Sequence, residues 1–432
     1  MSVGWRTERL QDVCQIKPPK KEAKQRLSNI DLVSFVPMSD LGVCKKELTL
    51  RDERSLSEVS GSYTYFAEND VLLAKITPCF ENGKLGIGRD LKNGIGFGSS
   101  EYIVFRSKGD VDPEYLFYFL SQASFRDAGT RVMSGAVGHK RVPKEFIENY
   151  RIPLPDLPEQ KRIVAILDEA FEAITTAVTN AEKNLANARE LFESYLNSVF
   201  SQKGEGWSEV RVEDVCDSII DCVNKTAPKV ENPTSYKMIR TTNVRDGVVS
   251  IDSVKYVTEV VYKVWTRRQV PKVGDVILTR EAPLGEVGML LSEDLVFLGQ
   301  RLVSYRTNHK ILNNYFLLYV FQSNSLQEQI QSLASGSTVQ HMRVPDSKNL
   351  KLSIPNLGEQ EKIIRRLDLL RNKKLQLETI YQQKLTALAE LKQSILQKAF
   401  AGELTEDVSS VKVERVDAER PVRCSHAGAW ER

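Results

Sequence analysis

The sequence predicts an α+β protein in which two α/β domains are joined by two long, antiparallel coiled-coil helices as a pseudo-two-fold internal repeat. Three observations predict this fold. The segment P-D-L-P-E-Q at Pro155 recurs as P-N-L-G-E-Q at Pro355, 200 residues later. Each copy opens an apolar-periodic stretch of about 40 residues, some three times the usual helix length. The halves also start alike, with G-W-R-T-E-R-L-Q-D-V-C from Gly4 and G-W-S-E-V-R-V-E-D-V-C from Gly206.

These segments set the predicted boundaries. We expect a first domain over residues 1–155, a long helix over 156–202, a second domain over 203–355 and a second long helix over 356–402. Each domain is long enough to bury its own core. Residues 403–432 are mixed in charge and aperiodic, so we expect a disordered tail there.

The composition is that of an ordinary soluble protein, with 432 residues, 41% hydrophobic and 27% charged. No run approaches the ~20 apolar residues of a membrane span, and the N-terminus lacks a signal-peptide core, so we expect a cytoplasmic protein without membrane contact. The net charge of +3 falls short of the usual basic footprint of small nucleic-acid-binding domains. Any nucleic acid would therefore be held by local basic patches, or with partners that supply part of the charge.

Both long helices carry a heptad seam in the same register. Asp156 and Asn356 each precede a glutamate, Glu159 or Glu359, by three residues, which marks a helix start. The first seam comprises Ile163, Leu167, Ala170, Ile174, Ala177, Ala181, Leu185, Ala188, Phe192, Tyr195 and Val199. The same steps, including one stutter, give Ile363, Leu367, Leu370, Lys374, Leu377, Tyr381, Leu385, Leu388, Lys392, Ile395 and Ala399, of which nine of eleven are apolar.

This shared register predicts that the two seams pack on each other or on the same kind of partner. Since the halves are in tandem, antiparallel pairing would relate them by an approximate two-fold axis. The two domains would then lie at opposite ends of a spacer of roughly 60 Å. The alternative is two unrelated amphipathic helices, each lying on its own domain.

Inside the halves the register returns at two strands. D-V-L-L-A-K-I-T-P (70–78) parallels D-V-I-L-T-R-E-A-P (275–283), and each reads as a buried strand that ends at a basic residue. A second strand pair ends at Arg106 and at Arg306. The intervening segments cannot be matched residue for residue, which predicts two different central domains on a duplicated scaffold.

A tyrosine-rich apolar run follows these strands in each half, over 115–122 and 315–322. Both runs are predicted to be buried helices, and base stacking by their aromatic rings is the alternative. The glycine-rich stretch Gly94–Ser100 opens no helix, so it is predicted to be a turn and not a nucleotide-binding loop.

Motifs of catalysis are missing from the sequence. There is no G-x-x-x-x-G-K-[ST] phosphate loop and no G-x-S-x-G nucleophile elbow. The six cysteines and four histidines show no zinc-ligand spacing. We therefore expect no catalytic, cofactor-binding or metal-binding residue, and a protein that recognises rather than transforms.

Polar and basic loop residues at equivalent places in the halves are the candidates for DNA contacts, because Arg, Lys, Asn and Gln read base edges and phosphates. The strand-end group comprises Lys75, Thr77, Asn82 and Lys84, with Arg280, Gln300 and Arg301 in the second half. The Ser-Gly loop group comprises Ser134, His139, Lys140 and Arg141, with Ser337, Thr338, Gln340, His341 and Arg343 in the second half. Both Ser-Gly loops contain H-x-R-V-P, whose His and Arg either brace the loop or contact phosphate.

Taken together, these features resemble the specificity subunits of type I restriction-modification systems. The resemblance covers Gly4 to about Thr405 and rests on the repeated P-x-L-x-E-Q helix entry, the G-W…D-V start of each half, the S-G loop before I-P, and Asp70–Lys84. The longer charged tail departs from the family pattern.

The resemblance implies a non-catalytic subunit with two target-recognition domains, each reading half of a bipartite, asymmetric target in double-stranded DNA. The helical spacers would set the gap and dock two methyltransferase subunits, and restriction/translocase subunits would complete the complex. S-adenosylmethionine, ATP and Mg would bind those partner subunits and not this chain. Two other readings stay open, namely a coiled-coil adaptor with protein-binding domains and a self-contained DNA enzyme with an unrecognised site.

Overall fold

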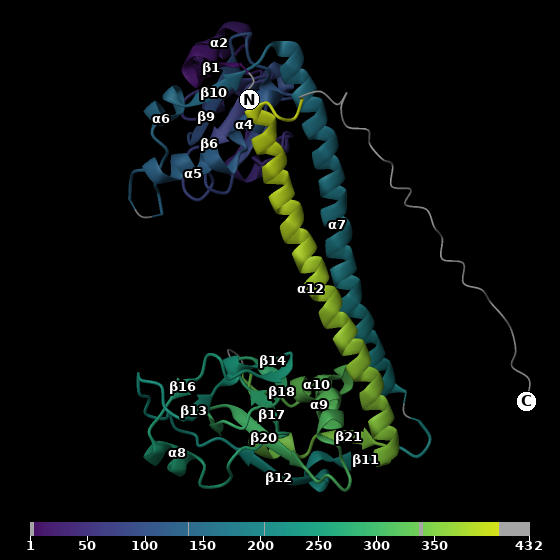
Figure 1. Cartoon of the computed structure of the whole chain (residues 1–432). Coiled ribbons are helices and arrows are strands. Elements are labelled where there is room, and N and C mark those ends of the chain that lie inside the picture. The colour runs from purple at the N-terminus through teal and green to yellow at the C-terminus, as the bar shows by residue number, and fades with distance from the viewer. Residues whose placement is uncertain (1–3, 137, 203, 337–339, 406–432) are drawn as a thin grey trace, which may run out of the picture. The chain divides into compact units, whose positions relative to one another are not determined.

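A computed structural model describes residues 4–136, 138–202, 204–336 and 340–405 (Figure 1). The chain folds as two compact units, unit 1 with Met1–Thr179 and Leu385–Arg432, and unit 2 with Asn180–Lys384. Two 45-residue helices, α7 (Leu157–Ser201) and α12 (Leu357–Ala401), contribute residues to both units. The sequence-based domain boundaries stay a prediction, and the predicted tail lies outside the described residues from residue 406 onward.

The described part of unit 1 contains two four-stranded sheets and a two-stranded ribbon. The first sheet has the order β2 (Cys14–Ile16), β9 (Tyr102–Ser107), β6 (Val71–Ala74) and β7 (Leu85–Ile87). The second has the order β4 (Asp52–Ser55), β3 (Leu32–Val36), β8 (Ile95–Gly98) and β5 (Thr64–Ala67). The ribbon pairs β1 (Arg6–Arg9) with β10 (Arg151–Leu154).

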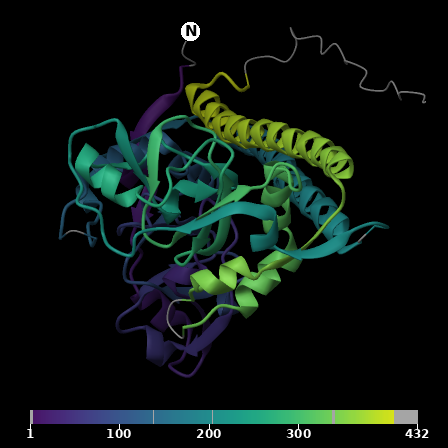
Figure 2. The ribbon, with the colours of Figure 1, turned by 90° about the horizontal axis from the view of Figure 1, so that it is seen from below.

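In unit 2, whose strands are the teal and green arrows of Figure 2, the described residues form a six-stranded sheet, a three-stranded sheet and a ribbon. The six strands run β12 (Cys216–Asp221), β20 (Leu302–Thr307), β17 (Val276–Arg280), β18 (Leu284–Met289), β15 (Gly247–Val249) and β14 (Val244–Arg245). The smaller sheet runs β16 (Lys255–Tyr256), β13 (Tyr236–Ile239) and β19 (Leu295–Leu298). The ribbon pairs β11 (Ser208–Arg211) with β21 (Lys351–Ile354).

The centres of the two halves share more than their sequences predict. The order β2-β9-β6-β7 is repeated as β12-β20-β17-β18, and the parallel pair β3–β8 is repeated as β13–β19. The units differ in the flanking strands. In unit 2, β15 and β14 extend the sheet that contains β12, β20, β17 and β18, and the corresponding sheet of unit 1 ends at β7. The prediction of two different central domains is therefore corrected to one topology with different edges. Buried strands accept many apolar residues, so their sequences diverge while the pairing persists.

Short helices connect the strands. Unit 1 contains α1 (Leu10–Val13), α2 (Lys21–Arg26), α3 (Leu56–Val59), α4 (Pro113–Leu120), α5 (Ala123–Val132) and α6 (Lys144–Asn149). Unit 2 contains α8 (Glu259–Trp265), α9 (Asn314–Gln322), α10 (Asn324–Ser332) and α11 (Val344–Lys348). Within the stretch Gly94–Ser100, predicted to be a turn, Ile95–Gly98 instead form β8, where glycine is needed because a Cβ at Gly96 would lie 2.3 Å from the Phe66 ring.

The long helices begin where their caps predict. The Asp156 carboxylate accepts a hydrogen bond from the Glu159 amide at 3.0 Å, and the Asn356 side chain accepts one from the Glu359 amide at 3.0 Å. A side-chain acceptor at this place satisfies an amide that has no partner inside the helix. Both helices therefore start at the residue after the cap.

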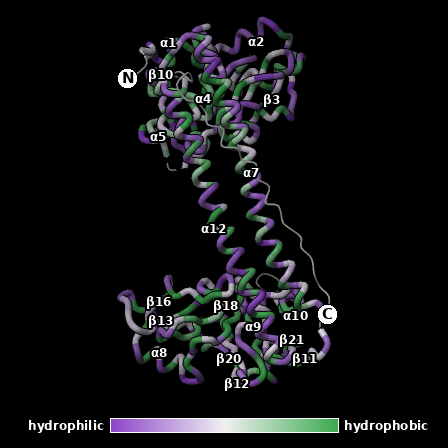
Figure 3. The backbone as a smooth tube through the Cα atoms, turned by 45° about the vertical axis from the view of Figure 1, so that its right-hand side comes forward, coloured by the Kyte–Doolittle hydropathy of each residue, from purple (hydrophilic) through white to green (hydrophobic). Residues whose placement is uncertain are grey.

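The predicted seams are the less exposed faces of the two helices. All eleven seam positions of α7 are buried or half-buried, and on α12 only Leu377, at 39% exposure, is more open. In Figure 3 hydrophilic and hydrophobic stretches accordingly alternate along both helices. In the part of the chain that the structure describes, no helix has the combination of length and apolarity that crossing a membrane requires.

Within each unit the two helices pack antiparallel, as predicted. In unit 2, Arg189 Nε of α7 lies 2.7 Å from Glu378 Oε1 of α12, and further along α7 Phe192 contacts the earlier residue Lys374. In unit 1, the start of α7 shares a hydrophobic core with Leu396 and Ala399 at the end of α12. The seams therefore pack on each other in both units.

The two lysines that interrupt the α12 seam have a shared explanation. Lys374 Nζ lies 5.3 Å from the ring centroid of Phe192, and Lys392 Nζ lies 4.8 Å from that of Phe171. An ammonium over an aromatic face is attracted by the ring, while its methylene stem covers apolar surface. Both lysines thus serve as seam residues.

The glutamine of each E-Q pair is a buried clamp between a long helix and its domain. Gln160 Nε2 donates to the carbonyls of Asp110 and Pro155, both at 2.9 Å, and its Oε1 accepts from the Asp112 amide at 2.8 Å. Gln360 makes the corresponding bonds to Ile311, Pro355 and Asn313 at 2.9 Å each. Asp112 and Asn313 then cap α4 and α9.

The tyrosine-rich helices α4 and α9 are buried, as predicted. The Tyr118 hydroxyl donates to Asp168 of α7, and the Tyr319 hydroxyl donates to Asp368 Oδ1 of α12 at 2.5 Å. Tyr115 also packs against Phe400, with ring centroids 5.0 Å apart. Because these rings fill the interface between domain and helix, the base-stacking alternative is not supported.

Replacing the clamp should destabilise unit 1. Gln160→Ala removes three hydrogen bonds, one buried and two partly buried, from two carbonyls and one amide, so we expect the free energy of unfolding to fall by about 2–4 kcal/mol. Urea denaturation followed by circular dichroism measures this. The control is Gln397→Ala at an exposed position of α12, which should change stability little. Equal stability of the two variants would contradict the clamp.

Candidate nucleic-acid interface

In unit 1 the structure brings the strand-end segment at Lys75–Thr77 and the Ser-Gly loop at Ser134–Arg141 together. The Thr77 amide donates to the Lys140 carbonyl, and the Val142 amide donates to the Lys75 carbonyl, both at 2.9 Å. Ser134 and Arg141 close the Ser-Gly loop by exchanging backbone hydrogen bonds of 3.1 and 2.9 Å. The candidates Lys75, Thr77, Ser134, His139, Lys140 and Arg141 therefore lie on one edge, which we call edge 1.

A carboxylate that the sequence did not single out organises the charges of edge 1. Arg141 binds Glu101 through two hydrogen bonds, Nε to Oε2 at 2.9 Å and Nη2 to Oε1 at 2.7 Å. Lys75 Nζ donates to the Ser100 carbonyl at 3.0 Å and lies 3.9 Å from Glu101. Arg141 holds the pKa of Glu101 below its ordinary value, and burial lowers the pKa of Lys75.

A cavity of about 270 Å³ opens beside these residues. Its polar lining is cationic, with Lys17 and Lys144 added to Lys75 and Arg141, and its floor includes Tyr102 and Ile147. Lys75 and Arg141 lie beside Glu101, and Lys144 pairs with Glu148 at 2.7 Å. Four cations beside two carboxylates leave an excess of positive charge at this place. Sequence reasoning missed Lys17 and Lys144, because only the fold brings them beside the strand end.

Unit 2 builds the corresponding edge 2 from the same segments. The Met342 amide donates to the Arg280 carbonyl at 3.0 Å, and the Arg280 amide donates to the Arg301 carbonyl at 2.8 Å. Ser335 and His341 exchange backbone hydrogen bonds of 3.0 and 2.9 Å. Arg301 Nη2 lies 3.1 Å from Glu281 Oε1. Edge 2 thus gathers the candidates Arg280, Gln300, Arg301 and His341, together with Glu281.

The matching of H-x-R-V-P between the halves needs correction. Arg141 bridges Ser134 and Ile76, whereas His341 bridges Ser335 and Glu281. Arg141 in unit 1 therefore occupies the position that His341, and not Arg343, occupies in unit 2. Arg343 instead lies at the N-cap of α11 and pairs with Asp346 at 2.8 Å. The bridge that closes the loop joins residues seven apart in unit 1 (Ser134 and Arg141) and six apart in unit 2 (Ser335 and His341), so similar letters occupy different structural positions.

The remaining candidates do not join an edge in the same way. Lys84 Nζ donates to the Met38 carbonyl at 2.6 Å, so this lysine ties its turn to the segment at Met38. Asn82 is exposed in the turn beyond Thr77, and Gln340 is exposed in the second Ser-Gly loop. Ser337 and Thr338 lie outside the described residues.

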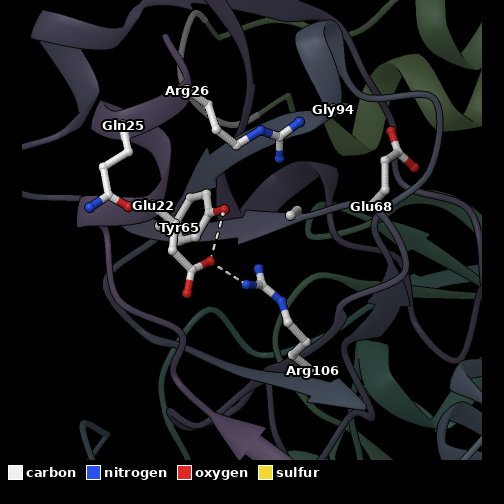
Figure 4. Close-up of a pocket in the computed structure, with 8 residues that line it drawn as sticks. Glu22, Gln25, Arg26, Tyr65, Glu68, Gly94 and Arg106 are labelled. Atoms are coloured by element: carbon white, nitrogen blue, oxygen red, sulfur yellow. Dashed lines mark hydrogen bonds and ion pairs between the residues drawn. The ribbon is translucent and has the colours of Figure 1, made fainter. Parts of the chain in front are cut away.

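A second cavity in unit 1, about 380 Å³ in volume, is lined by none of the candidates (Figure 4). Tyr65 donates to Glu22 at 3.4 Å, and Glu22 pairs with Arg106. Arg106 also forms two hydrogen bonds, of 2.7 and 2.6 Å, with the buried Asp70. Unit 2 repeats the last pair as Arg306 with Asp275 at 2.8 Å. The same ion pair between neighbouring strands in both halves is typical of a structural element.

No cluster of metal ligands is found among the residues that the structure describes. Burial raises the pKa of the Cys14 and Cys216 thiols to about 12, so both stay protonated at neutral pH. A protonated thiol is a poor nucleophile and a poor metal ligand.

The comparison with solved structures defines the fold class. A chain from a structural study of complex assembly and conformational transition of the type I restriction-modification system superposes with a TM-score of 0.76. The superposition covers 93% of this chain and 98% of that chain at 22% identity. At this identity the likeness establishes a shared fold.

The family assignment comes from sequence. The type I restriction modification DNA specificity domain matches residues 2–187 and again residues 204–387, so the chain belongs to this family. This match confirms the resemblance seen in the sequence motifs, and its two copies coincide with the two halves of the repeat.

Two relatives illustrate the match. The EcoEI specificity subunit of Escherichia coli is 30% identical over 213 residues, which is 48% of this chain. The chain spans about a third of that relative's length, 35%. The MjaVIII specificity subunit of Methanocaldococcus jannaschii is 27% identical over 318 residues, covering 69% of this chain and 72% of that protein.

The ion pairs of the edge and of the core should differ in their weight for stability. Asp70→Ala leaves Arg106 without its buried partner, so we expect a loss of about 3–5 kcal/mol in the free energy of unfolding. Glu101→Ala removes a partner from the exposed Arg141 and should cost much less. Urea denaturation of the two variants tests this. An equal loss would assign Glu101 to the structural framework and contradict its place in a binding edge.

Proposed function

We propose that this chain is the non-catalytic sequence-recognition subunit of a type I restriction-modification complex, with each unit reading one half of a bipartite, asymmetric DNA target. The observation that carries the proposal is the duplicated edge. The same three segments meet in both units, but they present different side chains. Two similar frames with different polar groups suit a target whose halves differ in sequence.

The chemistry of the edges supports DNA as the ligand. Lys75 and Lys140 on edge 1, and Arg280 on edge 2, supply cations for phosphate contacts. Arginine, glutamine and histidine also offer hydrogen bonds to base edges in the major groove. We therefore propose as DNA contacts the candidate residues Lys75, Thr77, Asn82, Lys84, Ser134, His139, Lys140, Arg141, Arg280, Gln300, Arg301, Ser337, Thr338, Gln340, His341 and Arg343.

Catalysis and assembly are proposed for partner subunits. Two methyltransferase subunits would carry S-adenosylmethionine, and restriction/translocase subunits would carry ATP and Mg, all in the cytoplasm. Support comes from relatives that are named specificity subunits and from the solved neighbour's place in a study of complex assembly. Leu369 and Ile380, eleven residues apart on the part of α12 that belongs to unit 2, are 56% and 55% exposed. Such a pair suits an apolar partner helix.

Mapping of methylated bases tests the proposal. The chain is produced in a strain free of related systems, together with a type I methyltransferase subunit, and genomic adenine methylation is sequenced. We expect one bipartite motif that disappears when this chain is omitted. Methylation without the chain, or a chain that methylates or cuts DNA by itself, would contradict the proposal.

Shortening both helices should shorten the gap of the target. Deletion of residues 178–184 from α7 and 382–388 from α12 removes one heptad from each, about 10 Å of helix, while the seam keeps its face. At ~3.4 Å per base pair, we expect a gap shorter by about three base pairs. Methylome sequencing of the double deletion measures the gap. An unchanged gap in an assembled, active complex would contradict the spacer role.

A further inference from the structure

The residue just before β9 in unit 1 and the residue just before β20 in unit 2 carry opposite charges. Glu101 precedes β9 in unit 1, and Arg301 precedes β20 in unit 2. The two residues occupy corresponding places, because β9 and β20 take the same position in their sheets. A charge reversal at one position of a repeated frame would leave a like-charge repulsion unless a neighbour changed as well.

The neighbours do change, and each unit again forms an arginine–glutamate pair. In unit 1 the partner of Glu101 is Arg141, which the Ser-Gly loop supplies. In unit 2 the partner of Arg301 is Glu281, which follows the basic residue of the strand end. The position of Glu281 is held by Ile76 in unit 1, and that of Arg141 by His341 in unit 2. The pair is thus present in both units, while its arginine comes from different segments.

These pairs are placed to orient an arginine rather than to stabilise the fold. The Arg141 and Arg301 side chains are 47% and 50% exposed, whereas their glutamates are 22% and 24% exposed. Exposed ion pairs contribute little to stability. Two hydrogen bonds to Glu101 fix the guanidinium plane of Arg141 and reduce the rotamer entropy lost on binding.

We propose that Arg141 and Arg301 are the specificity-determining residues of the two half-sites, each reading a guanine through its O6 and N7 acceptors. A planar guanidinium matches this pair of acceptors, which only guanine presents in the major groove. The proposal rests on the proposed function and deepens it by naming the base and the reader. Because the two arginines come from different segments, the recognised guanine occupies a different place in each half-site.

Methylome sequencing of variants in the assembled modification complex tests this. Arg141→Ala should relax one G·C position in one half-site, with a roughly 10- to 100-fold loss of preference, and leave the other half-site unchanged. Arg301→Ala should do the same in the other half-site. The matched controls are Arg9→Ala and Arg211→Ala, which remove exposed arginines that bind Asp12 and Asp214 through two hydrogen bonds. Both controls should keep the full motif.

A lysine variant separates base reading from phosphate contact. Arg141→Lys keeps the charge but loses the fork, so it should relax the same position as Arg141→Ala. The wild-type complex should bind DNA with 7-deazaguanine at that position more weakly than DNA with guanine. The Arg141→Ala complex should bind the two DNAs equally. A full motif in Arg141→Ala, or loss of all methylation in Arg141→Ala together with the full motif in Arg141→Lys, would overturn the inference. The proposed function fails separately, if the wild-type chain directs no bipartite motif.

Discussion

Each half of the protein depends on one buried glutamine at the start of its long helix. Gln160 and Gln360 bond to backbone groups that precede the aromatic helices α4 and α9, and to the proline before the long helix. A polar side chain without exposure is tolerated only when its groups are paired, and here each pairing fixes a junction between domain and helix. The Tyr118–Asp168 and Tyr319–Asp368 bonds add a second attachment about two helical turns later. The orientation of each domain on its helix therefore follows from a few residues that the repeat preserves.

Much of this fold was predictable because it is specified locally. Each long helix starts at its cap, Asp156 or Asn356. The stuttered seam then fixes which face of the helix is buried. The lysines at 374 and 392 looked like defects in the pattern, since cation–π contact with Phe192 and Phe171 requires a partner helix that the sequence does not show. The centres were harder. Strand pairing is non-local, so the repeat matched the segments of β6 and β17 and the ends of β9 and β20 but did not show the shared order of β2-β9-β6-β7 and β12-β20-β17-β18.

The sequence identified the loop segments that form the two edges, but it did not show the arginine–glutamate ion pairs in them. The strand ends at Lys75 and Arg280 and the Ser-Gly loops do meet, as the candidate groups require. The sequence could not show that Glu101 and Glu281 hold the arginines, because each lies in a segment distant in sequence from its partner. The repeated H-x-R-V-P motif gave the wrong alignment, because the backbone bridges show that Arg141 in unit 1 is equivalent to His341 in unit 2. The sequence also could not show that Lys84 donates to the Met38 carbonyl.

The central claim is that two equivalent edges on one chain engage DNA together. Hydrogen–deuterium exchange of the full chain in its assembled complex, with and without a DNA duplex that carries its motif, tests this most directly. The account predicts slower exchange in peptides covering 75–82, 99–101 and 138–141 of unit 1 and 280–283, 299–301 and 340–343 of unit 2. Exchange around the second cavity of unit 1, at Glu22–Arg26, should not change. Protection confined to one unit, or centred on that cavity, would contradict the account.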